Sequence, residues 1–182
     1  MKRYLLALPL LALGTPALAN TGVINFTGNI KAGTCPIEIR DPAGGTGGEV
    51  KMGQAMTGTF TAAGIESNHR SFTIEVKDAA QCAGWDGSSG AVNVAKVRFT
   101  GMHGGADSDN LFALDSNSVS DLALGLKDKH NTPVKHNGVS GEYPLNAAGQ
   151  NDLVFVAYYK SLSGSVPAGL ANAAVQLELV IN

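Results

Sequence analysis

The chain has 182 residues, a length typical of one domain. Its net charge is −2, so it lacks the excess of Lys and Arg with which a basic surface displaces counterions from nucleic acids, and this class of binder is excluded. Only 15% of its residues are charged, which also excludes a long coiled coil or a charged disordered tail.

Residues 1–19 have the pattern of a secretory signal peptide. Met1–Arg3 is a positively charged start, 4–13 is an apolar run, and Ala17–Ala19 has the small–x–small form of a cleavage site. A membrane anchor is the alternative, but this short apolar run, interrupted by Pro9, falls below the roughly 20 residues that span a bilayer. The sequence therefore predicts that 1–19 are cleaved and that the remainder is exported without inserting into the membrane.

Residues 20–30 follow the cleavage site as one amphipathic segment. In an extended strand its alternate residues share a face, with mostly polar residues on the other face. Two interpretations are open: an ordinary first strand of this chain's own sheet, or a strand that pairs with another molecule. The pattern alone favours the ordinary first strand, whereas the second interpretation would make 20–31 an extension ahead of a domain at 32–182. The residues that share the first face are Gly22, Ile24, Phe26, Gly28 and Ile30.

The chain has two cysteines, Cys35 and Cys82. An even number in an exported chain favours a disulfide, whereas a metal or redox pair would call for C-x-x-C spacing. A bridge closing a loop of about 48 residues would contribute roughly 4 kcal/mol to stability in the chain-entropy model. The sequence therefore predicts a structural disulfide between Cys35 and Cys82.

Most of the remaining chain alternates apolar and polar residues with the period of β-strands. Glycine-rich stretches such as 44–48 separate these segments, a pattern typical of an all-β sandwich or barrel. A change of phase between Val94 and Val97 predicts a β-bulge near Ala95–Lys96. Residues 153–159 are nearly all apolar, which predicts a strand buried on both faces. The expected strands are 35–39, 72–76, 92–99, 122–126, 153–159 and 175–181.

The last expected strand ends next to the final residue of the sequence. An Ig-like sandwich normally continues into a closing strand, and an open sheet edge over an apolar core is usually covered. This ending favours the interpretation that a strand from another molecule completes the sheet. The alternating apolar residues of the last strand are Val175, Leu177, Leu179 and Ile181.

Both ends of the chain resemble the pilin subunits of chaperone–usher fimbriae, such as type 1 fimbriae. Gly22–Ile30, followed five residues later by Cys35, resembles that family's N-terminal extension and first cysteine, and Cys82 resembles its second cysteine. The final strand resembles the family's C-terminal strand, with Ile181 where a tyrosine is usual. The region ahead of the final strand also resembles the corresponding region of the family, at Phe155–Tyr159, Gly164, Gly169 and Ala171–Ala173.

This resemblance implies an incomplete Ig-like β-sandwich that lacks its seventh strand. In that family a periplasmic chaperone first fills the resulting groove with one of its own strands. At the outer-membrane usher, the extension of the next subunit replaces it, a documented form of strand addition. The implied protein is a fimbrial subunit, exported through the periplasm to the cell surface and used in adhesion. Its implied partners are neighbouring pilin subunits, the chaperone and the usher.

The resemblance also assigns roles to particular residues. Ile24, Phe26 and Ile30 would fill pockets of the neighbouring subunit. Gly28 would lie over a pocket too shallow for a side chain. The residues implied to bound the acceptor groove and to pair with the chaperone are Val175, Leu177, Leu179 and Ile181.

No catalytic or metal-binding motif accompanies these features. The four histidines lie neither in H-E-x-x-H nor at metal spacing from a cysteine, so we expect them in exposed loops. Asp107–Asp109 begins like a calcium loop, but Phe112 and Ser118 stand where glycine and glutamate are needed, so we expect a polar turn. We therefore expect no enzymatic activity, no cofactor and no metal. The histidines are His69, His103, His130 and His136.

Two other classes of function stay open. A secreted, monomeric carbohydrate-binding sandwich would have a complete sheet and an aromatic platform, for which Trp85 on a glycine-rich loop is the candidate. A two-domain tip adhesin of the same fimbrial system would carry a separate lectin domain and lack the N-terminal extension. This chain has the length of one pilin domain and does have the extension.

Overall fold

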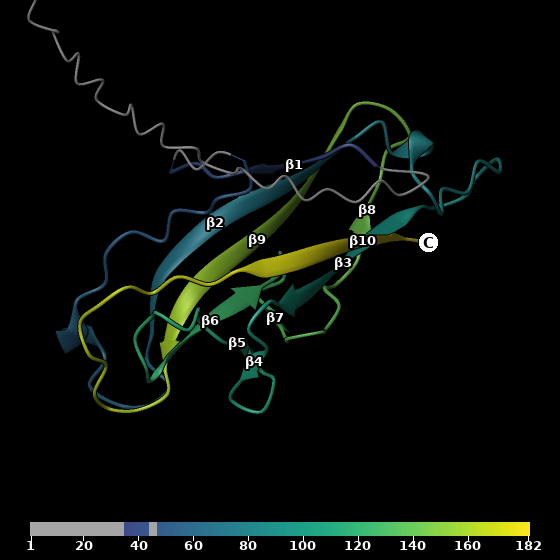
Figure 1. Ribbon diagram of the computed structural model, residues 1–182. Coiled ribbons are helices and arrows are strands. Elements are labelled where there is room, and N and C mark those ends of the chain that lie inside the picture. Colours follow the sequence, from purple (N-terminus) through teal and green to yellow (C-terminus); the bar gives the residue numbers. More distant parts are fainter. Residues whose placement is uncertain (1–34, 44–46) are drawn as a thin grey trace, which may run out of the picture. The chain divides into compact units, whose positions relative to one another are not determined.

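Two antiparallel β-sheets make up the domain in the computed structural model (Figure 1). The structure describes residues 35–43 and 47–182, within a compact unit that spans 32–182. In this part of the chain the helical structure is limited to two short 3-10 turns, Thr57–Thr59 and Ala79–Gln81. It contains no helix that is long and apolar enough to cross a membrane.

The larger sheet has seven strands and is centred on two long ones, β2 (Glu66–Lys77) and β9 (Gln150–Ser161). These two pair along most of their length, with β1 on the outer side of β2 and β6 on the outer side of β9. Beyond β6 lie β5 and then β4, while β7 also pairs with β6. The shorter strands are β1 (Ile37–Arg40), β4 (Gly105–Ala106), β5 (Leu111–Phe112), β6 (Leu122–Lys127) and β7 (Pro133–Val134).

The smaller sheet has three strands in the order β10, β3, β8. They span Val175–Ile181, Val94–Gly101 and Tyr143–Pro144, respectively. β3 lies in the middle, and β10 pairs with it along its whole length. β10 is therefore an edge strand, and this position determines where the candidate site lies.

The bulge predicted near Ala95–Lys96 is wrong. β10 and β3 pair without a shift of register from Ile181 opposite Ala95 to Val175 opposite Gly101. The change of phase arises because β3 begins only at Val94, so that Val92 lies in the preceding loop and is 79% exposed. Within β3 the core-facing residues are Ala95, Val97 and Phe99, a regular alternation.

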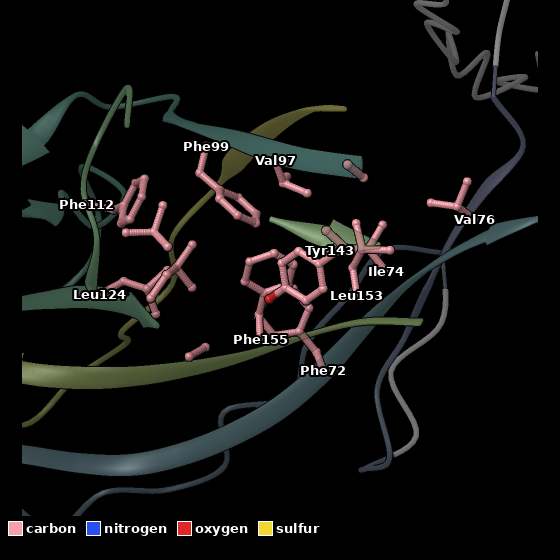
Figure 2. Packing of buried hydrophobic residues seen from close by; sticks show 14 of the residues in the cluster. Phe72, Ile74, Val76, Val97, Phe99, Phe112, Leu124, Tyr143, Leu153 and Phe155 are labelled. Carbon is pink, nitrogen blue, oxygen red and sulfur yellow. The ribbon is translucent and has the colours of Figure 1, made fainter. Parts of the chain in front are cut away.

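Phe155 of β9 is the centre of the core between the sheets (Figure 2). Its ring lies 5.7 Å from that of Phe72 in β2, and 5.1 and 5.3 Å from those of Phe99 and Tyr143 in the smaller sheet. Because these rings come from both sheets, they join the layers into a single core. The packing confirms the predicted all-β sandwich, and the same alternation that predicted β2, β6 and β10 supplies its inward-facing side chains.

The burial of β9 differs in part from the prediction. Ala157, Tyr158 and Tyr159 are buried in succession, so both faces of this part of the strand are covered. Val154, however, is 40% exposed. The prediction of burial on both faces is therefore wrong for the first half of the strand, where Val154 faces solvent.

The expected disulfide joins Cys35 to Cys82, whose Cα atoms are 4.6 Å apart at a sequence separation of 47. Two residues beyond Cys82, Gly84 has a φ of +90°, and a Cβ there would lie only 2.5 Å from the carbonyl oxygen of Ile181. Glycine therefore allows the chain after the bridge to pack directly on the end of β10. The bridged region thus supports the last residues of this edge strand.

Replacing both Cys35 and Cys82 by alanine should lower the free energy of unfolding by about 4 kcal/mol, because the unfolded chain would regain the freedom that the closed loop removes. Urea unfolding of the oxidised protein and of the double variant measures the difference. Chemical reduction of the unmodified protein serves as a control and should give a similar loss. A double variant as stable as the oxidised protein would contradict a stabilising bridge.

Candidate functional site

An apolar groove of about 790 Å³, open to solvent, lies beside β10. One wall is formed by residues 171–173 and the start of β10, and the other by residues 48–53. The floor consists of core side chains from both sheets, so the groove exposes part of the sandwich interior. These floor residues are Phe72, Phe99, Leu124, Leu126, Ala157 and Tyr159.

The β10 wall is a strand edge that pairs with β3 on one side alone within the described residues. Val175 and Leu177 line the groove and are half-buried, while Gln176 and Glu178 on the opposite face are exposed. A half-buried apolar row beside an unpaired strand edge is incomplete in two ways. It lacks apolar neighbours on one side, and it offers backbone groups with which a further strand could pair.

The opposite wall, 48–53, forms no strand, yet it repeats the same alternation. Val50 and Met52 are half-buried and pack against the core, whereas Lys51 between them is exposed. The wall is held by side chains: Asp41 Oδ2 accepts a hydrogen bond from the Lys51 backbone N–H at 2.7 Å. Both walls therefore present half-buried apolar residues toward a groove that no strand of the described chain fills.

Tyr159 connects the floor to the β10 wall. Its ring lies in the floor, and its hydroxyl donates a hydrogen bond to the carbonyl oxygen of Ala171. The neighbouring Asn172 carbonyl accepts hydrogen bonds from the backbone N–H of Asp115 at 2.8 Å and from Ser118 Oγ at 3.2 Å. The loop ahead of β10 is thus fixed at the groove by hydrogen bonds.

Polar groups are few at this site. Asp115 lines one end of the groove, and its Oδ1 lies 3.4 Å from Nε2 of His103. Among the described residues no three His, Cys, Asp or Glu side chains form a cluster that could hold a metal ion. Glu49 and Lys51 also line the groove, on the 48–53 wall, but its floor is apolar and suits apolar and main-chain contacts.

The histidines correct one sequence expectation. His69 lies in β2, where its ring stacks on that of Tyr158 at 5.3 Å. His136 is half-buried, and its Nδ1 accepts a hydrogen bond from the Gly101 backbone N–H at 3.0 Å. The expectation is therefore wrong for His69 in that this exposed residue lies in a strand, and for His136 in that its side chain is half-buried. Asp107–Asp109 form a turn between β4 and β5 with positive φ angles, as a polar turn would.

The structure places the predicted groove residues on one face of β10. Val175 and Leu177 line the groove, whereas Leu179 and Ile181 pack against the core beyond its end. The predicted donor residues Gly22, Ile24, Phe26, Gly28 and Ile30 lie outside the described residues.

Sequence reasoning missed the 48–53 wall. The available signal was the alternation of Val50 and Met52 around Lys51, which was concealed by the adjacent glycine-rich stretch. Without that wall, β10 would bound an open face rather than a groove.

Comparison with known proteins identifies relatives along almost the whole chain. The model of a family described as fimbrial protein matches residues 24–182. Long polar fimbria protein A of Salmonella typhimurium is 30% identical over 185 residues, which cover 98% of this chain and 96% of that protein.

Solved structures share the fold. A chaperone–usher pilus structure has a TM-score of 0.62 at 20% identity, covering 92% of this chain and 100% of that chain. The CupB6 tip adhesin of Pseudomonas aeruginosa has a TM-score of 0.56 at 21% identity, covering 80% of this chain, which spans 37% of the adhesin. At these identities the structures show a common fold alone.

The Tyr159→Phe variant should be less stable by about 1–2 kcal/mol, because the Ala171 carbonyl loses its donor in a partly buried setting. Urea unfolding measures this change. Tyr158→Phe is the matched control, since no hydrogen bond from the neighbouring hydroxyl is found among the described residues. Equal effects of the two substitutions would contradict a specific role of the Tyr159 hydroxyl.

Stability should also fall at alkaline pH through Tyr159. Burial raises the pKa of this phenol above its usual value of 10.0, so the folded state favours the protonated form. The contribution is complete below the unfolded pKa and is lost as pH rises through the folded pKa. As the pH rises above the usual tyrosine pKa of 10.0, Tyr159→Phe should therefore lose less stability than the unmodified protein, which urea unfolding at a series of alkaline pH values measures. Identical pH profiles would contradict this assignment.

Proposed function

Because the chain belongs to the fimbrial protein family, we propose that it is a structural subunit of a chaperone–usher fimbria. Its groove would accept a β-strand from a neighbouring subunit, and its own residues 20–31 would enter the groove of the next. Each subunit would thereby complete the sandwich of another, and the fibre would serve adhesion at the cell surface.

The observation that carries this proposal is the open groove between β10 and the 48–53 wall. An inserted strand could pair with the unpaired edge of β10, while its alternate side chains covered the apolar floor. Such a strand needs an apolar residue at every second position and no charge facing inward. Residues 20–30 of this chain have that pattern and carry no charged residue.

The side chains of the extension would supply a substantial part of the binding free energy. Ile24, Phe26 and Ile30 would be the buried residues, and burying three such side chains contributes roughly 5–9 kcal/mol before the cost of ordering the segment. Gly28 between them would lie where the floor comes closest to the inserted backbone. Val175, Leu177, Leu179 and Ile181 would form the receiving edge, with the last two at its far end.

Assembly of this kind produces a filament, because the donor segment and the groove are different surfaces of each subunit and the contact does not close on itself. Before assembly, an uncovered groove would be an aggregation hazard, so a periplasmic chaperone would fill it, and an outer-membrane usher would direct the exchange. Export guided by residues 1–19 is consistent with that route.

A structural role also accounts for this site better than the alternatives do. Trp85 is half-buried against the core, which makes it a packing residue rather than an exposed platform for a carbohydrate. The groove is lined chiefly by core side chains, which suits a strand rather than the polar surface of a sugar or a reacting substrate. We propose no catalytic role.

Replacing Gly28 by tryptophan should prevent fibre assembly, because a large side chain would collide with the groove floor while leaving this subunit's own groove intact. Thr27→Trp is the matched control, since Thr27 lies on the opposite face of the extended segment and should be tolerated. Surface fibres are counted by electron microscopy of cells that express the chain with its chaperone and usher.

Soluble Gly28→Trp subunit should accumulate in complex with the chaperone. Wild-type fibres from this variant would contradict insertion of the segment into the groove. A chain that forms no fibres even when unmodified would contradict the proposed function itself.

A further inference from the structure

We propose that Asn68 and Arg70 are positioning residues that hold the 48–53 wall at the distance an inserted strand requires. Both side chains donate to the carbonyl oxygen of Met52, Asn68 through Nδ2 at 3.1 Å and Arg70 through Nε at 3.3 Å. The inference deepens the proposed function and rests on it. It assigns part of the affinity for the donor strand to two residues of β2 that do not themselves line the groove.

The wall depends on such contacts because no strand pairing fixes it within the described residues. A segment outside a sheet normally has its backbone groups satisfied by water and moves accordingly. Here Asp41 binds the N–H of Lys51, and the two β2 side chains bind the C=O of the next residue. Successive residues of the wall are thereby tied to different parts of the domain.

A bulge in β2 makes the Asn68 contact possible. The pairing of β2 with β9 shifts register between Ser67 and Arg70, and Asn68 has a φ of 53°, a left-handed conformation that asparagine tolerates better than most residues. The bulge redirects this side chain from the regular alternation of the strand toward Met52. Asn68 is therefore selected both by its backbone conformation and by its amide donor.

Arg70 is exposed and reaches the wall from β2. It lies two residues before Phe72, which forms part of the groove floor, so the two share a face of the strand. Next to Met52, Gly53 has a φ of +73°, and a Cβ there would lie 2.9 Å from Nη2 of Arg70. The glycine therefore leaves room for the guanidinium to lie against the wall.

These contacts connect the floor to the wall that faces β10. With the Met52 carbonyl held, the half-buried side chains of Val50 and Met52 keep their inward direction before any strand arrives. Without it, the wall would have to be ordered at the moment of insertion, and that ordering would subtract from the binding free energy. These hydrogen bonds should therefore act mainly on the dissociation rate of the inserted strand.

The test uses the exported full chain and a fluorescent peptide of residues 20–31. Asn68→Asp keeps the size of the side chain and its tolerance of a positive φ, but it replaces the donor by a carboxylate. We expect a roughly tenfold rise in Kd, expressed mostly as faster dissociation, because the lost hydrogen bond is replaced by repulsion from the Met52 carbonyl. Arg70→Met is a second variant with an uncharged stem and should weaken binding in the same direction.

Asn137→Asp is the matched control. Asn137 also has a positive φ, of 57°, but its Oδ1 accepts a hydrogen bond from Thr100 Oγ1, so a carboxylate there preserves the contact. This variant should bind the peptide with an unchanged Kd.

Hydrogen exchange separates positioning from a general loss of stability. In Asn68→Asp the amides of 48–53 should exchange faster while those of β6 and β9 keep their protection. If the unmodified chain binds the peptide, two results would overturn the positioning role. One is an unchanged peptide affinity in both β2 variants, and the other is faster exchange throughout the domain. Failure of the unmodified chain to bind the peptide would overturn the proposed function, and the positioning role with it.

Discussion

Within the described residues, β10 has one edge that pairs with no strand and lies beside an apolar floor, and the rest of the structure depends on this constraint. Water can satisfy the backbone groups of an exposed edge, but it cannot stabilise the apolar side chains of Val175 and Leu177 or the floor beneath them. The described part of the sandwich is therefore incomplete at this edge. Its architecture is explained by how the remaining elements hold that opening in shape.

Around the groove, side-chain hydrogen bonds fix segments of the chain that strand pairing fixes elsewhere in the fold. Asp41 and the β2 residues hold the 48–53 wall, while Tyr159 holds the loop ahead of β10 at Ala171. At the far end of β10, Gly84 lets the region after the disulfide pack against Ile181. The first two sets of contacts hold the segments on either side of the groove, and the third holds the end of β10. A sheet with one strand absent needs supports of this kind if its gap is to keep a definite width.

The sequence predicted β2, β6 and β10 from apolar residues at every second position, and in most of β10 this alternation reflects one face packed against the core and one exposed face. In β6 the residues between the leucines are buried as well, so the alternation there comes from small residues on the second face. The prediction failed where the local pattern has another cause: Val92 suggested strand continuation although it lies in a loop. The bulge at Asn68 was invisible because a left-handed asparagine leaves no periodic signal. The 48–53 wall was missed because it is held by partners about 10 to 18 positions away, as with Asp41 and Arg70.

The energetics of the proposed joint explain why such an opening could be useful. Three buried side chains of the extension would contribute roughly 5–9 kcal/mol, which is comparable to the 5–15 kcal/mol that stabilises an entire domain. A subunit with its groove filled would therefore be stabilised by an amount similar to the stability of its own fold. Breaking the joint would then resemble unfolding a domain more than separating two surfaces. A fibre made from such joints would resist mechanical load without covalent links between subunits, because separating two subunits would expose both the apolar floor of the groove and the apolar face of the inserted strand.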